Sequence, residues 1–484
     1  MRILLIIISF ILIISLGKVL ASPIVLKEDV DEAMLMPNYW LKGDATQVLL
    51  DPNEILKYNK ELQKTLPVTM VNLADYKNSL DSTTLKKLII PSNLDKLELY
   101  KDNIKLYPKY YENLKLEMNI NAIHKSNSVT FGIVVTRSNL RTYPTTDSVS
   151  YDLESTDFDR WQETAVPLGT PVVILHTSKS NKFVYIQMYN YRGWILKDNI
   201  ATTSKDDWLN YINEYNNDFL VITANHLQLS YNPTSTTISN LQLNMGTKLT
   251  LLESKIPALI DNQSTKNNYV VKIPIRKDNG LLAYKLAIIS PSNKVHEGYL
   301  PFNEENLINQ AFKMQGDRYD WGGLNGGRDC SSFVNDIYSV FGIYLPRNTS
   351  EQALIPNKVD ITESISYTNR QDLIKKLNPG SLLVMEGHVM LYLGSVDGKS
   401  YVIQAISSEY PNNNQQFINQ VMVSTTDLIA ENGETLLQNI KSIIQIGKQI
   451  DLEAPLKTST ISAIIIKSNT DTNSTTSAST SSKK

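Results

Sequence analysis

The chain has 484 residues, and at roughly 100–200 residues per domain this length predicts three or four domains. Hydrophobic residues make up 42% and charged residues 20% of the chain, a balance that supplies packed cores and excludes a collagen, a coiled coil or a disordered protein. Lys and Arg (47) nearly cancel Asp and Glu (49), and we find no long basic run, which argues against a nucleic-acid partner. The single cysteine, Cys330, excludes an internal disulfide and a cysteine-based zinc cluster, and we expect no metal or cofactor.

The first residues are typical of an export signal. Arg2 precedes an uncharged apolar run, Ile3–Leu16, and Val19 and Ala21 place small side chains at the −3 and −1 positions of a cleavage site. The run is shorter than the ~20 residues that span a bilayer as a helix. We therefore expect residues 1–21 to be a signal peptide and the mature chain, which has no later apolar run of spanning length, to be periplasmic, extracellular or in the cell wall. An uncleaved membrane anchor is the alternative.

Residues 22–125 are rich in Leu, Lys, Asn and Tyr and predict a small, mainly helical domain without chemistry of its own. Asp51 before Pro52 is a good helix start, and the spacing of Leu85, Leu88 and Ile89 is helical. The segment holds one histidine, His124, and no cluster of catalytic residue types.

Two segments of similar length then predict two small β-barrels. Residues 126–205 contain short β-branched runs such as 130–136, 171–176 and 183–189, separated by turn formers. Residues 212–302 repeat this pattern. Both segments end in a glycine, an aromatic and an apolar residue (Gly193-Trp-Ile and Gly298-Tyr-Leu), so we interpret them as two copies of one barrel type.

Residues 303–456 predict an α+β domain. A helix is expected over 303–314, with Glu304 and Glu305 in the first turn, where the helix dipole favours acidic side chains. A flexible Gly-rich loop leads to a helix that starts at Cys330, and three apolar runs follow, two of them joined by the hairpin pair Asp397-Gly398. Residues 467–484 lack apolar periodicity and predict a disordered tail.

The chemistry centres on Cys330. A thiol at a helix N-terminus has a lowered pKa, and a cysteine nucleophile needs a base partner. Of five histidines only His388 follows the cysteine, at the start of a strand, and Gln404 is the polar residue in the apolar run of the next strand. We expect His388 and Gln404 to be partners. The structural alternatives stay open: Cys330 as a small buried hydrophobe, His388 and Gln404 as satisfied core groups, and Trp321 as packing alone.

These residues carry a resemblance. The segments Tyr319-Asp-Trp-Gly-Gly, Asp329-Cys-Ser-Ser-Phe, Leu345-Pro-Arg and Gly387-His-Val-Met-Leu-Tyr-Leu-Gly resemble the NlpC/P60 cysteine peptidases. Upstream, 131–144, 158–164 and 175–178 resemble the bacterial SH3 domain that precedes NlpC/P60 in some cell-wall peptidases. The arrangement of a helical segment, two SH3-like barrels and a catalytic domain, over roughly residues 30–440, resembles the γ-D-glutamyl-L-diamino acid endopeptidases.

The resemblance implies a papain-like site. Cys330 would be the nucleophile, His388 the general base and Gln404 the residue that orients the ring. Tyr319, Asp329 and Ser331 match the positions that hold the peptide amine, and Trp321 and Thr349 are further candidate substrate contacts.

The implied activity is hydrolysis of the γ-D-glutamyl-diamino acid amide bond in peptidoglycan stem peptides. A catalytically silent cell-wall binding protein and an acyltransferase or amidase on the same scaffold are the alternatives. Because a carboxylate beside Cys330 opposes the thiolate, we expect Asp329 to face a substrate cation, the free α-amine of an N-terminal L-Ala.

Overall fold

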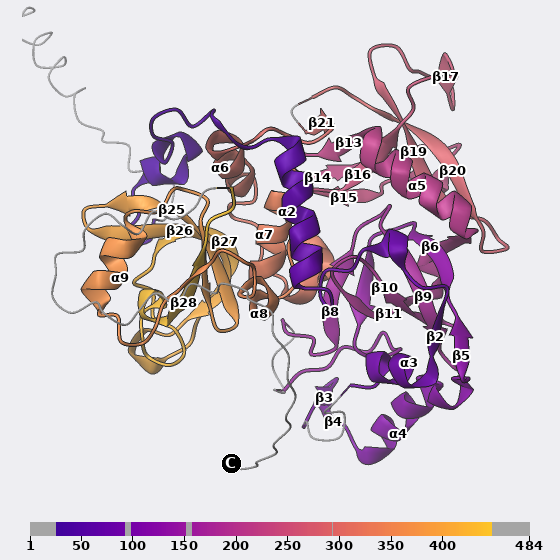
Figure 1. The fold of residues 1–484 in the computed structure, drawn as a ribbon, viewed down its shortest axis with the longest axis horizontal. Coiled ribbons are helices and arrows are strands. Elements are labelled where there is room, and N and C mark those ends of the chain that lie inside the picture. Colours follow the sequence, from indigo (N-terminus) through magenta and orange to yellow (C-terminus); the bar gives the residue numbers. More distant parts are fainter. Residues whose placement is uncertain (1–25, 92–97, 152–156, 293, 448–484) are drawn as a thin grey trace, which may run out of the picture.

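The computed structural model describes residues 26–91, 98–151, 157–292 and 294–447. The predicted signal peptide (1–21) and the predicted tail (467–484) lie outside these ranges. The described chain forms a first sheet domain (126–203), a second sheet domain (219–297) and a C-terminal domain (302–446). An N-terminal segment (26–123) starts beside the C-terminal domain and ends beside the first sheet domain (Figure 1). Within the described ranges, no helix combines the length and the hydropathy needed to cross a bilayer.

The first sheet domain is a seven-stranded antiparallel sheet with the strand order β12-β6-β9-β10-β11-β7-β8. The β-branched runs of the sequence form its strands, and both faces of the sheet are buried. Val134, Val166 and Ile195 belong to one core, and Ile133 and Val173 belong to another. The strands are β6 (Thr130–Val134), β7 (Ser138–Arg141), β8 (Gln162–Val166), β9 (Pro171–Thr177), β10 (Phe183–Gln187), β11 (Arg192–Leu196) and β12 (Ile200–Thr203).

The second sheet domain is a five-stranded antiparallel sheet with the order β20-β19-β16-β13-β21, and helix α5 (Lys205–Asn217) joins it to the first. Its main strands are β13 (Phe219–Ile222), β16 (Lys248–Leu251), β19 (Tyr269–Arg276), β20 (Leu282–Ile289) and β21 (Val295–Glu297), with the small pairs β14 (His226–Gln228) and β15 (Gln242–Asn244), and β17 (Leu259–Ile260) and β18 (Gln263–Ser264). The proposed internal repeat is not structurally equivalent at its end, because Gly193-Trp-Ile lies inside β11 whereas Gly298-Tyr-Leu follows β21.

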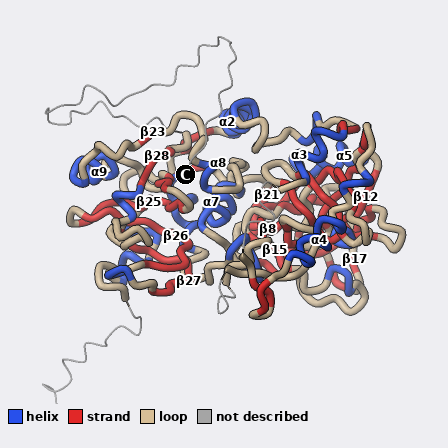
Figure 2. The backbone as a smooth tube through the Cα atoms, turned by 90° about the horizontal axis from the view of Figure 1, so that it is seen from below, coloured by secondary structure: helices blue, strands red, loops and turns tan. Residues whose placement is uncertain are grey.

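The C-terminal domain is an α+β unit in which helix α7 packs against strands β25 and β26 of a six-stranded sheet, ordered β23-β28-β24-β25-β26-β27. Figure 2 shows α7 and α8 between this sheet and the strands of the sheet domains. The elements are β22 (Phe302–Asn303), α6 (Glu304–Phe312), α7 (Cys330–Ser339), α8 (Thr349–Gln352), β23 (Val359–Asp360), α9 (Tyr367–Ile374), β24 (Leu382–Met385), β25 (His388–Val396), β26 (Lys399–Glu409), β27 (Gln416–Thr425), α10 (Leu436–Asn439) and β28 (Ile440–Ile444).

The three predicted apolar runs of this domain are β24, β25 and β26. Asp397 and Gly398 turn between β25 and β26 with φ angles of 49° and 83°, the positive values that a tight hairpin requires. Strands β27 and β28, which complete the sheet, were not predicted from the sequence.

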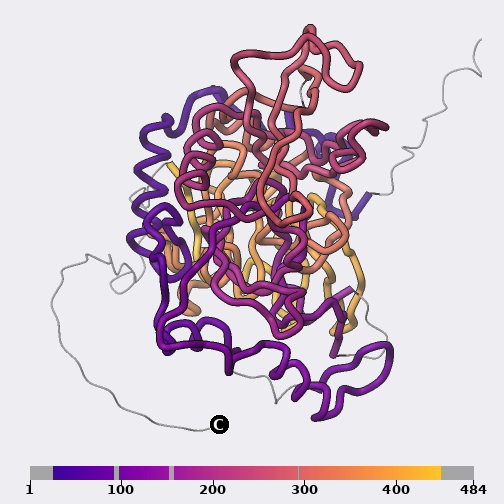
Figure 3. The backbone as a smooth tube through the Cα atoms, turned by 90° about the vertical axis from the view of Figure 1, so that its right-hand side faces the viewer, coloured from indigo at the N-terminus to yellow at the C-terminus, as the bar shows by residue number. Residues whose placement is uncertain are grey.

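The N-terminal segment divides its packing between two neighbours (Figure 3). Its first part, with Trp40, Ile55 and Leu62, belongs to the core of the C-terminal domain, and β1 (Val48–Leu50) pairs with β22. Its second part, from Leu73 to Ile123, belongs to the core of the first sheet domain. This packing differs from the expected self-contained helical domain. Helical periodicity predicts an amphipathic helix, but it does not identify the surface that the apolar face covers.

The elements of this segment are helices α2 (Pro52–Thr65), α3 (Ser82–Ile89) and α4 (Pro108–Glu117), and short strands β2 (Ser79–Asp81), which pairs with β5 (Ser126–Ser128), and β3 (Tyr100–Lys101), which pairs with β4 (Ile104–Lys105). Helix α2 starts as its sequence predicts: the Asp51 side chain accepts hydrogen bonds from Asn53 N and Glu54 N in a capping box.

Candidate active site

Cys330 is the first residue of α7. Asp329 caps the helix, because its side chain accepts a hydrogen bond from Ser332 N while Ser332 Oγ accepts one from Asp329 N. The thiol is buried, and its Sγ lies 3.7 Å from Thr349 Oγ1 and 3.9 Å from Gly387 O. The sulfur therefore lies at the positive end of a helix dipole and beside the strand that starts at His388.

His388 and Gln404 lie on the adjacent strands β25 and β26. His388 Nε2 is 2.6 Å from Gln404 Oε1, and Gln404 Nε2 donates a 2.8 Å hydrogen bond to Ser424 Oγ on β27. Because the Gln404 amide donates to Ser424, its oxygen faces the ring, and Nε2 of His388 must carry the proton. The other ring nitrogen, Nδ1, is left for Cys330, whose thiol acts to raise the pKa of His388.

The thiol and the imidazole shift each other toward an ion pair. Burial raises the pKa of Cys330, but the hydrogen bond and the charge of His388 outweigh this effect and lower the pKa below its usual value. Burial lowers the pKa of His388, but Cys330 and Gln404 outweigh this effect and raise it. The geometry therefore favours a thiolate beside an imidazolium, the reactive form of a cysteine nucleophile.

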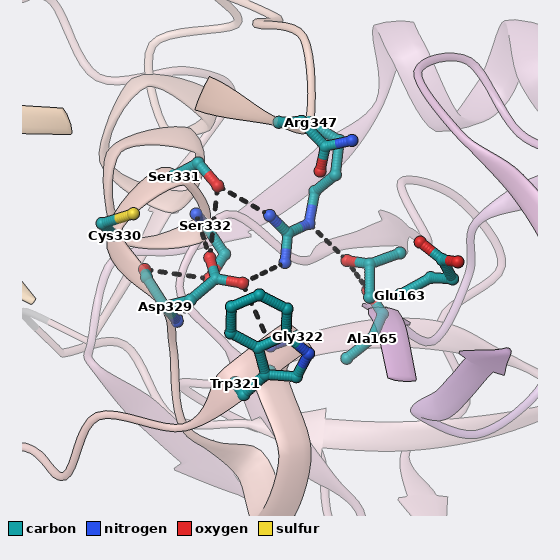
Figure 4. A network of polar contacts seen from close by, with 12 residues as sticks. Glu163, Ala165, Trp321, Gly322, Asp329, Cys330, Ser331, Ser332 and Arg347 are labelled. Atoms are coloured by element: carbon teal, nitrogen blue, oxygen red, sulfur yellow. Dashed lines mark hydrogen bonds and ion pairs between the residues drawn. The ribbon is translucent and has the colours of Figure 1, made fainter. Parts of the chain in front are cut away.

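A buried arginine, Arg347, joins the nucleophile helix to the first sheet domain (Figure 4). Its Nη2 donates to Asp329 Oδ2 at 2.7 Å, its Nη1 donates to Ser331 Oγ at 2.8 Å, and its Nε donates to Thr164 Oγ1 on β8. Burial raises the pKa of Asp329, but the charge of Arg347 and the Ser332 hydrogen bonds outweigh it, so the pKa lies below its usual range. Asp329 is thus an ionised, paired carboxylate.

The partners of Asp329 correct the expectation that it faces a substrate cation. Oδ1 accepts hydrogen bonds from Ser332 N and Ser331 Oγ, and Oδ2 accepts them from Gly322 N and Arg347 Nη2. A carboxylate has about four lone-pair sites, so its own helix, the loop and Arg347 already use the capacity of Asp329. The charge that would oppose the thiolate is balanced by a protein cation.

Tyr319, Trp321 and a segment of the first sheet domain form an aromatic cluster beside the site. The Phe158 ring centroid lies 6.2 Å from that of Tyr319 and 5.5 Å from that of Trp321. The Arg160 guanidinium carbon lies 5.4 Å from the Trp321 ring centroid, and Asp157 forms an ion pair with Arg318 at 2.9 Å.

Burial raises the pKa of Tyr319 well above its usual value, and the thiol and Asp329 act in the same direction. Trp321 also donates from Nε1 to Gln162 O, so it packs between the domains as well as lying near the site.

The Gly-rich loop before Cys330 is packed, in contrast to the flexible loop that we expected. Gly322, Gly323 and Gly326 are buried and have positive φ angles of 58°, 69° and 92°. A Cβ atom on Gly322 would lie 2.6 Å from Gln162 Cγ of β8. The glycines are therefore needed because the loop turns through left-handed conformations directly against the first sheet domain.

The structure brings the eight predicted site residues into one region, with His388 bound to Gln404, Thr349 beside the Cys330 sulfur, and Ser331 bound to Arg347. Arg347, Ser424 and Thr164 were given no role from the sequence. Arg347 lies in the Leu-Pro-Arg segment. An arginine that follows apolar residues can indicate a buried ion pair, so this residue could have been predicted from the sequence. In the described part of the chain, no group of three or more His, Cys, Asp or Glu side chains is arranged to hold a metal.

Comparison with known proteins identifies two domains. Residues 316–432 match the NlpC/P60 family, and residues 147–196 match an SH3 domain of the SH3b1 type. The chain therefore carries an NlpC/P60 domain, preceded by an SH3 domain within the first sheet domain. No curated protein matches the sequence.

Among solved structures, an NlpC/P60 endopeptidase from Photobacterium damselae subsp. piscicida is similar, with a TM-score of 0.66 and 19% identity over 84% of this chain and 95% of that chain. An NlpC/P60 family protein from Bacillus cereus ATCC 10987 matches with a TM-score of 0.44 and 18% identity over 65% of this chain and 99% of that one. The similarity to the Photobacterium structure shows that the two proteins share their fold across nearly the whole described chain.

Proposed function

We propose that this protein is an exported cysteine endopeptidase that hydrolyses the γ-D-glutamyl-diamino acid amide bond of peptidoglycan stem peptides. One observation carries the proposal: a thiol at a helix N-terminus, whose pKa is lowered by a histidine that a buried glutamine orients, within an NlpC/P60 domain. A silent binding protein has no use for a lowered thiol pKa, so this geometry favours an enzyme over that alternative.

The side chains support acyl transfer to water in two steps. The Cys330 thiolate attacks the amide carbonyl, forming an S–C bond, and the C–N bond breaks as His388 gives its Nδ1 proton to the leaving amine. Water then attacks the thioester, His388 takes a proton from it, and the thiolate leaves. Ser332 N is already bound by the Asp329 side chain, so the backbone N–H groups of Cys330 and Ser331, which precede it in the first turn of α7, are the suitable donors for the oxyanion.

We further propose a preference for peptides with a free N-terminal L-Ala, now on steric grounds. Asp329 is saturated by Arg347 and other partners, so it does not supply an attraction for the amine. Instead, Phe158 packs on Tyr319 and Trp321, and Asp157 pairs with Arg318, so the first sheet domain covers the side of the site on which the amine would lie. A bulky glycan on the alanine would collide with this segment.

The test is mass spectrometry of stem peptides incubated with the purified mature protein. We expect L-Ala-γ-D-Glu and a free diamino acid peptide as products, and no product with Cys330→Ala, whose circular dichroism should be unchanged. Water as the acceptor gives the free acid, whereas an amide-linked product would indicate an acyltransferase. If the steric argument is right, an N-acetyl group reduces kcat/KM less than a muramyl group does. Absence of cleavage in every stem peptide would reject the proposed function.

A further inference from the structure

A buried arginine of the nucleophile loop contacts the second sheet domain, which also donates a hydrogen bond from Asn244 Nδ2 to Gly326 O of this loop at 3.1 Å. Arg328 lies two residues before Cys330, and it is 1% exposed. Its guanidinium donates from Nε to Asp336 Oδ2 on α7 at 2.7 Å and from Nη1 to Asp317 Oδ2 at 3.2 Å. The backbone at Arg328 is also fixed, because its carbonyl accepts a hydrogen bond from Asp320 N.

Asn225, which immediately precedes β14 of the second sheet domain, completes this set of contacts. Its Oδ1 accepts a 2.6 Å hydrogen bond from Arg328 Nη1, and its backbone oxygen accepts a 3.0 Å hydrogen bond from Arg328 Nη2. Its Nδ2 donates to Asp317 Oδ1 at 2.7 Å. One amide therefore binds both the arginine and one of the carboxylates that neutralise it.

Asn225 is itself held in place by its own domain. Its backbone oxygen also accepts a hydrogen bond from Met245 N, directly after β15. The neighbouring His226 lies with Nε2 3.8 Å from Asp317 Oδ2, and its Nδ1 is 3.2 Å from Gln242 Nε2. The position of Asn225, and through it that of Arg328, is thus set by the second sheet domain.

We propose that Asn225 is a positioning residue for the nucleophile: through Arg328 it fixes the entry of the chain into α7, and so the alignment of the Cys330 thiol with His388. Only Asp329 separates Arg328 from Cys330, so a displacement of the guanidinium is transmitted to the first turn of α7. The inference rests on the proposed role of Cys330 as a nucleophile, but it does not depend on which peptide is cleaved.

Alkylation of Cys330 by iodoacetamide across a pH series tests this inference, because Cys330 is the only cysteine in the chain. In Asn225→Ala we expect the alkylation profile to move to higher pH, since a misaligned His388 lowers the thiol pKa less. We also expect kcat for a stem peptide to fall by about 10- to 100-fold, the size of effect that a displacement of about 1 Å has on a reaction. KM should change little, because Asn225 does not touch the substrate site.

Asn232→Ala is the matched control. Asn232 is another asparagine of the second sheet domain, and its Nδ2 donates to Asp261 Oδ2 at 2.7 Å within that domain. We expect this variant to lose a similar amount of thermal stability and to keep the wild-type alkylation profile and kcat. In an Arg328→Met background, Asn225→Ala should cause no further shift of the profile.

Three results would overturn the inference. Asn225→Ala could keep the wild-type profile, Asn232→Ala could shift it equally, or Asn225→Ala could shift it further in the Arg328→Met background. If Arg328→Met does not fold, the comparison of the two asparagine variants decides alone. An ordinary thiol profile in the unmodified protein would instead reject Cys330 as an activated nucleophile, and the proposed function with it.

Discussion

The ring of His388 is held from one side by an amide that cannot carry charge. Gln404 is fully buried, and Ser424 fixes its orientation, so it can only orient the imidazole and support its protonated form. We expect Gln404→Ala to lower turnover much less than His388→Ala does, because general base catalysis itself contributes about 10²–10⁴-fold. Steady-state kinetics of the two variants test this, and Ser424→Ala should have a smaller effect than either. Equal losses in the first two variants would contradict an orienting role for Gln404.

The pH profile gives a second, independent test at this site. The Cys330–His388 pair titrates in two steps, and the reactive thiolate–imidazolium form exists between the lowered pKa of the thiol and the raised pKa of the imidazole. The Gln404 hydrogen bond raises the pKa of His388, so its removal lowers that pKa. The alkaline limb of kcat/KM should therefore move to lower pH in Gln404→Ala. A profile that keeps its alkaline limb would contradict this assignment.

The triad could be expected from the sequence because elimination is decisive here: there is one cysteine, and one histidine follows it. Arg347 and Arg328 could not be assigned in the same way. Their partners Thr164 and Asn225 lie far away in the sequence, and one sequence contains no record of which distant polar groups meet a buried guanidinium.

At the scale of elements, helix α7 starts from a buried ion pair. Arg347→Met would leave the Asp329 charge buried without its cation, which costs about 3–5 kcal/mol of stability. The double variant with Asp329→Asn should recover part of this loss. Chemical denaturation of the unmodified protein, the two single variants and the double variant measures the coupling energy between Arg347 and Asp329. Purely additive effects on the free energy of unfolding would contradict a stabilising ion pair.

The same ion pair predicts a dependence of stability on pH. The pKa of Asp329 is depressed in the folded protein, so its contribution is present above the unfolded pKa of about 3.9 and is lost as pH falls through the folded pKa. The loss of stability in Arg347→Met should therefore be largest near neutral pH and should shrink on acidification. An equal loss at all pH values would indicate packing rather than charge.

The Gly-rich loop provides an element-scale test with an internal control. In Gly322→Ala the new Cβ would lie 2.6 Å from Gln162 Cγ, at a residue with φ of 58°, and the loop must move away from β8. We expect a strong loss of activity. Gly316→Ala has a similarly positive φ of 84° but no heavy atom within 4 Å of the new Cβ, so it should cost backbone strain alone. Equal activities of the two variants would contradict the role of the close contact.

The longer β-branched runs predicted strands β6, β9, β10 and β11 of the first sheet domain and β13, β16, β19 and β20 of the second. Strand β27 was not predicted, because Gln416–Thr425 is half polar and only its pairing with β26 makes it a strand. Strand β28 is a run of only five residues, Ile440–Ile444, which was not singled out in the sequence. The packing of the Gly-rich loop was missed for a related reason: glycines indicate flexibility or close approach equally well, and only the neighbouring strand decides between them.

At the scale of the whole molecule, the C-terminal domain includes residues from the start of the described chain. Trp40 is 1% exposed, its ring centroid lies 5.4 Å from that of Tyr401 on β26, and its Nε1 donates to Met34 O. Trp40→Ala should destabilise the catalytic domain by about 3–5 kcal/mol, the usual cost of deleting a buried aromatic side chain. The adjacent Tyr39, which is 37% exposed, gives the control variant Tyr39→Ala. Thermal inactivation should shift for Trp40→Ala alone, and equal shifts would contradict the role of Trp40 in this core.

Because the first part of the N-terminal segment packs into the core of the C-terminal domain, this core needs residues that are synthesised early and residues that are synthesised late. During synthesis, residues 30–62 appear first, yet the strands and helices that they cover, from β22 to β28, appear last. Contacts of such large sequence separation form late and slowly. A core that is closed by residues 30–62 together with β22–β28 cannot form before β28 has been synthesised, so we expect the Cys330 site to become reactive only after the chain through β28 has left the ribosome.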